Sequence, residues 1–225
     1  LRDHRAAGRW AARPRFPHVD HEVRMLDLWL NFMNMGHRIT AVGVSDVHGL
    51  DAPGRDRTYV EADDDRPSAF DEDAFVEAVK GGRAVVSKGA FARVFVNDSA
   101  TCGDTITDTD AEVDVHVIIE AIPEIDVTYY EVFANCDRVL SVLTSDPGAV
   151  VKVDEHRSLT LAADAHLVVL AYGSQDMPRG FSNYDAAGKP RLVTNPIYVD
   201  VDGNGVFDPP GGKPCSYALE SPPEM

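Results

Sequence analysis

Asp46 and His48 are the residues of this chain whose types and spacing best suit catalytic chemistry. They stand two residues apart, directly after a short apolar run at residues 39–44. A carboxylate and an imidazole at the end of a buried strand can ligate one zinc, manganese or iron ion. Such an ion would favour hydrolytic chemistry, although two ligands are too few for a catalytic metal. The alternative is that Asp46 caps a turn and His48 is a solvated loop residue.

A second group of oxygen-bearing residues lies at residues 200–208. Oxygen ligands at positions 1, 3, 5 and 9, with a backbone carbonyl at position 7, are typical of a calcium-binding loop. These positions are filled by Asp200, Asp202, Asn204, Asp208 and the Val206 carbonyl. The bidentate glutamate expected at position 12 is replaced by Gly211. The alternative is a Gly-Asn-Gly turn that closes the last strand.

Helical and strand patterns alternate in the first ninety residues. Apolar spacing and capping residues predict helices over residues 20–36 and 71–80, the second beginning at its cap, Asp71. Apolar runs predict strands over residues 39–44 and 84–86. This alternation of helix and strand is typical of an α/β fold with parallel strands.

The pattern changes after residue 90, where short β-branched runs alternate with turns and no long helical stretch intervenes. Such a pattern predicts an antiparallel β-sandwich of immunoglobulin-like architecture. His116 and His166 fall inside these runs and are interpreted as strand residues rather than ligands. The predicted strands are 91–97, 112–122, 127–134, 138–143, 150–154, 158–162, 166–172 and 196–201.

Composition limits the classes of function. The formal charge is −16, from 37 acidic and 21 basic residues, which argues against nucleic-acid binding. No apolar run approaches the roughly 20 residues that span a bilayer. Three cysteines without a C-x-x-C motif allow one disulfide but leave the compartment undecided. The chain begins with leucine, and we expect it to be a processed protein or a fragment.

Residues 36–49 read Gly-His-Arg-Ile-Thr-Ala-Val-Gly-Val-Ser-Asp-Val-His-Gly, and Arg-Thr-Tyr-Val follows at residues 57–60. Residues 77–79 and 82–89 add Glu-Ala-Val and Gly-Arg-Ala-Val-Val-Ser-Lys-Gly. Together these stretches resemble the polymerase and histidinol phosphatase (PHP) family of metal-dependent hydrolases, in its carbaryl-hydrolase-like branch. The resemblance covers roughly residues 20–205.

This resemblance implies a distorted seven-stranded β/α barrel with two or three metal ions, in which Asp46 and His48 are the last ligand pair. The family's N-terminal His-x-His motif is absent from this chain. The expected fold is therefore α/β plus all-β, a partial PHP-type barrel followed by an immunoglobulin-like sandwich. The expected division is 1–90 for the barrel part, 91–203 for the sandwich and 204–225 for a tail rich in proline and glycine.

Two functions follow from the incomplete ligand set. In the first, further polypeptide completes the site, and metal-activated water hydrolyses a phosphoester, an ester or an amide. Arg57 then stabilises the developing negative charge, although it is equally suited to a surface ion pair with the acids at residues 61–65. In the second, the chain is a non-catalytic structural, assembly or calcium-binding module.

The cofactors and partners follow from the same two functions. The expected cofactors are zinc, manganese or iron, together with calcium at residues 200–208. The expected partners are a small-molecule substrate or the rest of the same polypeptide, with a homo-oligomer allowed by exposed sheet edges. Because millimolar calcium is an extracellular resource, an extracellular or periplasmic location is favoured, with the cytoplasm left open.

Overall fold

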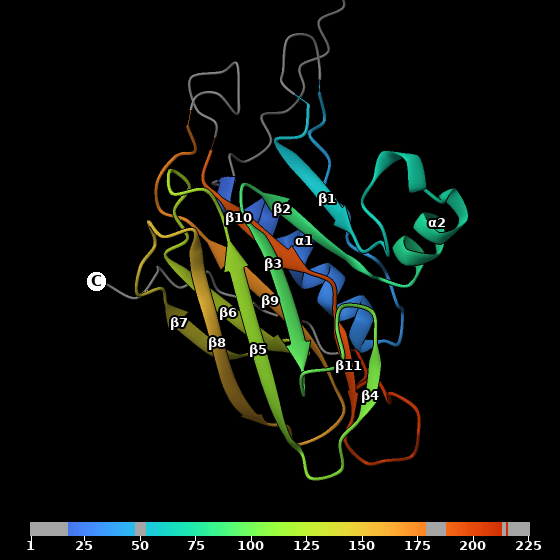
Figure 1. The fold of residues 1–225 in the computed structure, drawn as a ribbon. Helices are drawn as coiled ribbons and strands as arrows, with labels where there is room; N and C mark the ends of the chain where they lie inside the picture. Colours follow the sequence, from blue (N-terminus) through green and yellow to red (C-terminus); the bar gives the residue numbers. More distant parts are fainter. Residues whose placement is uncertain (1–17, 48–52, 179–187, 213–214, 216–225) are drawn as a thin grey trace, which may run out of the picture.

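The protein is described by a computed structural model that covers residues 18–47, 53–178, 188–212 and 215. Its described part is mostly β, with two sheets and two short α-helices arranged in layers (Figure 1). The predicted antiparallel two-sheet architecture of the second half of the chain is confirmed at this level. None of the helices in the described part of the chain has the length and apolarity that a membrane crossing requires.

The large sheet has eight strands and follows the order β1-β2-β10-β9-β11-β4, with β6 on the other edge of β9 and β7 beside β6. All of its pairs are antiparallel except β11 with β4. The strands are β1 Asp56–Val60, β2 Ala84–Lys88, β4 Thr105–Thr107, β6 Tyr129–Ala134, β7 Asp137–Leu143, β9 Ala165–Tyr172, β10 Arg191–Thr194 and β11 Ile197–Asp200.

The small sheet has three antiparallel strands, β3 Phe91–Val96, β5 Glu112–Glu120 and β8 Val151–Thr160, with β5 in the centre. Alternate residues of β5 are fully buried, as a strand with one face on a core requires. These buried residues pack with side chains of β6 and β9 in one apolar cluster. The main core therefore lies between the two sheets.

The two helices have different surroundings. Helix α1, His18–Asn34, covers the outer face of the large sheet, where Leu30 and Met33 pack with β6 and β9 side chains (Figure 1). Helix α2, Glu72–Lys80, follows a short 3-10 helix, Pro67–Ala69, and has no buried residue. The Asp71 side chain accepts a hydrogen bond from the Ala74 backbone, so the predicted cap is confirmed.

The structure corrects the expectation of parallel strands and a barrel. β1 and β2 pair with each other in antiparallel fashion, and β2 also pairs with β10. No barrel closes within the described residues. The sequence pattern misled because helix–strand alternation indicates parallel pairing only when each helix crosses over to the next strand of the same sheet. The large sheet contains strands from both sides of residue 90, and the division of the chain at that residue stays a prediction.

Residues 39–44 were predicted to form a buried strand, and this prediction is wrong. The segment is extended but joins no ladder, and Ile39, Val42 and Val44 are exposed. Side chains hold it instead: Asn195 bonds the backbone of Ala41, and Thr58 bonds that of Gly43. The hydrogen bonds of the segment's backbone thus go to the side chains of Asn195 and Thr58. The segment therefore does not extend the sheet as a further strand.

One disulfide joins Cys136 to Cys215, beside the end of α1. The third cysteine, Cys102, is a buried thiol whose pKa burial raises to about 12. A thiol in this state is neutral at physiological pH and unreactive. The cysteines are therefore structural in the described part of the chain.

Candidate functional site

Asp46 ends the extended segment beside β1. The hydroxyl of Ser45, the residue before it, donates to the Asp56 carbonyl at 2.9 Å and accepts from the Gly54 backbone N–H at 2.6 Å. Asp46 itself is exposed and has a positive φ of 48°. His48 lies outside the described residues. Within the described residues, Asp46 belongs to no group of three or more ligand side chains.

Arg57 lies on β1, half-buried. Its Nε is buried and has no hydrogen-bond partner among the described residues. Its guanidinium lies 5.9 Å from the centre of the Tyr59 ring. Of the acids proposed as surface partners, Glu61 pairs with Arg83 and Asp64 with Arg66. These two acids therefore form ion pairs with other arginines and not with Arg57.

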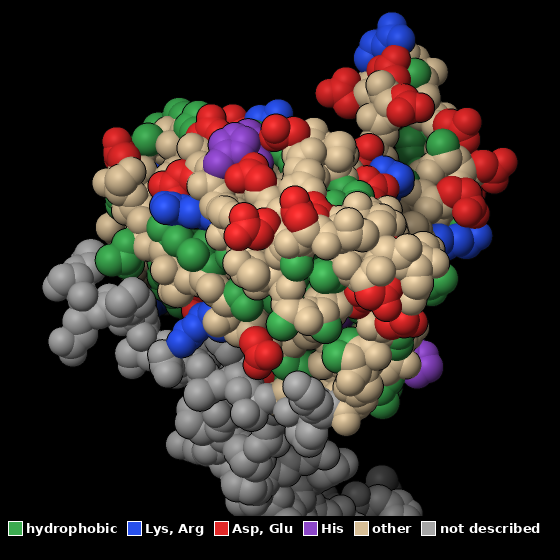
Figure 2. Space-filling model, turned by 90° about the horizontal axis from the view of Figure 1, so that it is seen from below, with side chains coloured by type: hydrophobic (Ala, Val, Ile, Leu, Met, Phe, Trp, Pro, Cys, Tyr) green, Lys and Arg blue, Asp and Glu red, His purple; other side chains and the backbone are tan. Residues whose placement is uncertain are grey.

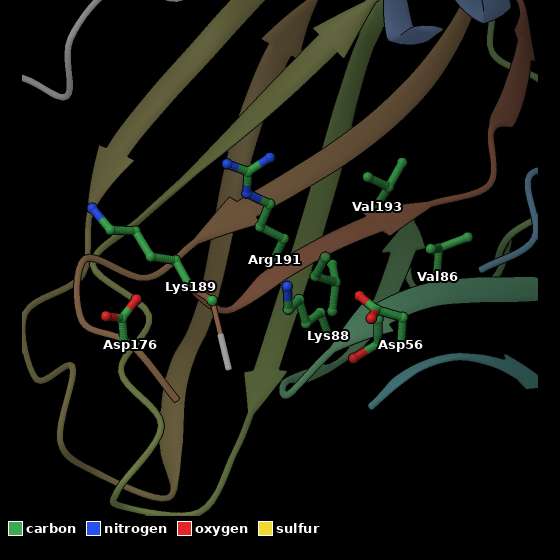
Figure 3. Close-up of a pocket in the computed structure, with 10 residues that line it drawn as sticks. Asp56, Val86, Lys88, Asp176, Lys189, Arg191 and Val193 are labelled. Atoms are coloured by element: carbon green, nitrogen blue, oxygen red, sulfur yellow. The ribbon is translucent and has the colours of Figure 1, made fainter. Parts of the chain in front are cut away.

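A cavity of about 290 Å³ lies where β1, β2 and β10 meet (Figure 3). Three basic residues line it, Lys88, Lys189 and Arg191, together with Asp56 and Asp176. Such a concentration of cations is unusual in a chain with a net charge of −16. It makes the cavity a candidate site for an anionic group.

Strand register assembles the charged wall of this cavity. Lys88 on β2 stands directly opposite Asp56 on β1 and opposite Arg191 on β10. Residues in register on adjacent strands point to the same face of a sheet. Burial lowers the pKa of Arg191 from its ordinary value. Sequence reasoning missed this site because Lys88 and Arg191 are far apart in the chain, and no local motif marks either of them.

The cavity adjoins the segment that ends in Asp46. Asp56 lines the cavity, and its carbonyl accepts the hydrogen bond from Ser45. The predicted metal ligand Asp46 therefore directly follows a residue, Ser45, that is hydrogen-bonded to Asp56 in the cavity wall.

The predicted calcium loop begins at Asp200, which is fully buried at the end of β11. Its carboxylate accepts bonds from the Gly203 and Gly205 backbone N–H groups, at 2.8 and 2.9 Å, and from the Thr107 hydroxyl at 2.9 Å. Burial raises the pKa of Asp200, but these donors outweigh burial and leave it below the ordinary value. Asp200 is therefore a preorganised carboxylate.

Asp164, just before β9, is a further member of this group that sequence reasoning missed. Its two oxygens accept the Val201 and Asp208 backbone N–H groups at 2.8 and 2.7 Å, which fixes both ends of the loop. Carboxylate oxygens of Asp164, Asp200 and Asp202 lie within 4.8 Å of one another. Nothing in the local spacing around Asp164 indicates this role.

The remaining loop residues interact mainly with one another. The Asn204 amide donates to Asp202 and Asp208, and its oxygen accepts the Val206 N–H. The side chain of Val206 is exposed, which leaves only its carbonyl as a ligand. The loop is thus folded around its own oxygens, with three carboxylates gathered at its base.

Comparisons with protein-family models, with curated proteins and with solved structures find no match for this chain.

Proposed function

We propose that this chain supplies part of a metal-dependent hydrolase of the PHP type, acting on a substrate with an anionic group such as a phosphoester. The supporting observation is the cationic cavity beside the segment that ends in Asp46. In this proposal Asp46 and His48 hold zinc, manganese or iron, and Lys88 and Arg191 bind the anionic group. Arginine and lysine are the side chains that most often bind phosphate oxygens.

Exposed apolar side chains around the extended segment support a shared site. Val42, Val44 and Val47 of the segment are all exposed. Clustered apolar exposure indicates a surface that another part of a protein covers. In this proposal the cover is the polypeptide that completes the metal site, and the strands after residue 90 form an immunoglobulin-like sandwich.

The chemistry divides between the metal and the chain. A bound transition metal supplies an activated water for hydrolysis. Lys88 and Arg191 orient the substrate and neutralise its charge. Arg57 does not line the cavity, because it follows Asp56 on β1 and its side chain points to the opposite face of the strand. Asp46 is the single predicted transition-metal ligand among the described residues, so in this proposal the other ligands come from His48 and from polypeptide that the structure does not describe.

Binding of inorganic phosphate, measured by isothermal titration calorimetry, tests the anion part. We expect Arg191→Gln and Lys88→Gln each to weaken phosphate binding about tenfold or more, since each removes a charge-assisted hydrogen bond. Lys80→Gln is the matched control, because Lys80 is an exposed lysine paired with Glu77 on α2. Equal phosphate binding by all four proteins would contradict the proposal.

Metal content and hydrolysis test the catalytic part. We expect purified protein to contain zinc, manganese or iron, and Asp46→Ala to lower that content. Hydrolysis of p-nitrophenyl phosphate should follow the metal content. Protein that contains no transition metal and stays inactive after zinc, manganese or iron is added would contradict this part, whatever the result with phosphate.

The disulfide supports an oxidising compartment, extracellular or periplasmic, as part of this proposal. Disulfides persist in such compartments and are rare in the cytosol. Mass determination of the protein from its native source, with and without reduction and alkylation, tests this location. Two alkylated cysteines without prior reduction, in addition to Cys102, would contradict it.

A second candidate function is a calcium-binding structural module, favoured by the three carboxylates that converge at Asp164, Asp200 and Asp202. A cation there would relieve the repulsion between them. We expect millimolar calcium to raise the melting temperature by several degrees over EGTA, and Asp202→Asn to remove that rise. Asp154→Asn, which changes an exposed carboxylate elsewhere, is the control. A melting temperature indifferent to calcium would exclude this function.

A further inference from the structure

His116 and His156 form a stacked pair on the small sheet. The two residues stand directly opposite each other on β5 and β8. Their ring centroids lie 3.9 Å apart, with an angle of 15° between the ring planes. Val115 and Val117, on either side of His116, are fully buried in the core, so the pair lies on the outer face of the sheet. Figure 2 shows neighbouring histidine side chains surrounded by acidic ones on the surface.

Each imidazole has a carboxylate of its own. Nε2 of His116 lies 2.8 Å from Asp154 Oδ1, and Nδ1 of His156 lies 2.6 Å from Asp114 Oδ2. The bond to Asp114 raises the pKa of His156, as expected where the ring donates its proton. A carboxylate that accepts one ring N–H directs the lone pair of the other ring nitrogen outward, an arrangement typical of metal-binding histidines.

Asp98 brings a third ligand from a different element. It lies in the turn after β3 with a positive φ of 56°. Its neighbour Asn97 anchors the turn to β5, because the Asn97 side-chain oxygen accepts the Asp114 N–H and the Asn97 N–H donates to the Asp114 carbonyl, both at 2.9 Å. Ligand atoms of Asp98, His116 and His156 lie within 4.8 Å of one another. Three strands and a fixed turn thus bring these groups together.

We propose that Asp98, His116 and His156 form a surface site for a divalent transition metal of the zinc type. Two imidazoles and one carboxylate suit zinc and the neighbouring metals, whereas calcium and magnesium prefer oxygen ligands alone. Asp114 and Asp154 orient the two rings. Three protein ligands leave a fourth tetrahedral position for water. The site lies on the small sheet, whereas the cationic cavity lies on the large sheet and Asp46 beside it, so the site is independent of the proposed function.

Metal binding requires a small change in the pair. Lone pairs of parallel stacked rings do not converge on one point, so the rings of His116 and His156 must turn out of their stack. The torsion that turns a histidine ring is broad, and the turn costs little. The side chain of His156 is 53% exposed and is free to turn, whereas that of His116 is 18% exposed and lies against the Phe95 ring. Addition of metal is therefore expected to separate the stacked rings.

Titration with zinc chloride, followed by isothermal titration calorimetry, tests the proposal. Because Asp46 and His48 can contribute a second zinc equivalent, the comparison is between variants. We expect His116→Ala and His156→Ala each to lose one equivalent of zinc or to weaken it at least tenfold. Asp98→Asn keeps the size of the side chain and tolerates the positive φ, and we expect it to weaken the same equivalent. His37→Ala, which removes an exposed histidine elsewhere, should bind as the wild type does.

Two further measurements separate ligation from structure. Asp114→Asn removes an orienting carboxylate, and we expect it to weaken zinc about tenfold or more without removing a ligand. Cobalt(II) should develop visible absorption bands in the wild type that His156→Gln lacks, with the melting temperature of the metal-free proteins unchanged. Zinc binding by the two histidine variants that equals the wild type in stoichiometry and affinity would overturn the proposal.

Discussion

Strand β5 and the segment at residues 39–47 contain similar apolar residues in opposite environments. Val113, Val115, Val117 and Ile119 of β5 are fully buried. In the segment, Ile39 is 42% exposed, and Val42, Val44 and Val47 are 57%, 73% and 41% exposed. Composition therefore does not distinguish the two regions. What differs is whether other strands surround them.

The neighbours of each region explain the difference. β5 is the central strand of its sheet, bonded to β3 and β8, and the large sheet lies across the core from it. The segment has no ladder, and the side chains of Thr58 and Asn195 hold its backbone. Apolar residues are buried only where another surface completes the packing. Four predictions test this contrast, beginning with the largest effect.

Truncation of the same residue type in both regions should give very different costs. We expect Ile119→Ala to lower the free energy of unfolding by about 4 kcal/mol, because it leaves a cavity in the core. Ile39→Ala should change it by about 1 kcal/mol or less, since Ile39 is 42% exposed and lies outside the core. Urea denaturation measures both. A cost above about 1.5 kcal/mol for Ile39→Ala would mean that this side chain is covered in solution.

Loss of the disulfide should destabilise the sandwich. Cys136 and Cys215 are separated by 79 residues in sequence, so the bond restricts a long loop in the unfolded chain. We expect Cys136→Ser with Cys215→Ser to lower the free energy of unfolding by about 3 kcal/mol. Dithiothreitol should destabilise the wild type equally and have no further effect on the double variant. If dithiothreitol destabilised the wild type and the double variant equally, the disulfide between Cys136 and Cys215 would be contradicted.

A buried histidine should make stability depend on pH. His166 is fully buried, its Nε2 lies 2.7 Å from Asn34 Oδ1, and burial lowers its pKa to about 4. The unfolded chain, with a pKa near 6.5, then takes up the proton first as the pH falls. Stability is therefore complete above pH 6.5 and decreases toward pH 4. Between pH 7 and pH 5 we expect a loss of about 2 kcal/mol from this group.

Two variants isolate this contribution in urea denaturation at both pH values. His166→Gln keeps a polar side chain but does not titrate, so it should lose about 2 kcal/mol less than the wild type on acidification. His37→Ala, which removes an exposed histidine, should keep the wild-type dependence. Identical pH dependence of the wild type and His166→Gln would contradict the buried, neutral state.

The smallest expected effect concerns the ties that hold the extended segment. The Thr58 hydroxyl accepts the Gly43 N–H at 2.8 Å and donates to the Gly43 carbonyl at 2.9 Å. We expect Thr58→Val to lower the free energy of unfolding by about 1 kcal/mol or less, and to speed hydrogen exchange at the Gly43 amide. Thr58→Ser keeps the hydroxyl and should retain the protection. Unchanged exchange in Thr58→Val would mean that something else holds the segment.

Local signals predicted several elements well. Helix α2 has its cap at Asp71 and ends before Gly81, as predicted. The alternating runs after residue 90 correspond to strands of two antiparallel sheets. The loop at Asp200 folds around its own oxygens, and calcium binding by it stays a prediction. Each of these features depends on residues that are only a few positions apart, so the sequence alone is enough to predict it.

Contacts between residues that are far apart in the chain could not be predicted from local sequence patterns. The antiparallel pairing of β1 with β2, the exposure of Ile39, Val42 and Val44, and the presence of Asp164 beside Asp200 were not predicted. Neither was the alignment of Lys88 with Arg191 across β2 and β10. The sequence pattern around His116 indicates only an ordinary strand residue, because its partner, His156, lies on another strand. Register between strands depends on packing of whole faces, which no local pattern contains.

The sequence by itself determined the caps, the strand periodicity, the oxygen-rich loop and the strongly acidic charge, because these depend on side-chain types and short spacing. Only the tertiary structure decided which apolar run is buried and which distant charges and histidines meet. The physical reason is that burial and ligand geometry are properties of neighbours in space. The cationic cavity and the histidine pair are both products of antiparallel register, and each arises from residues that are unremarkable in isolation.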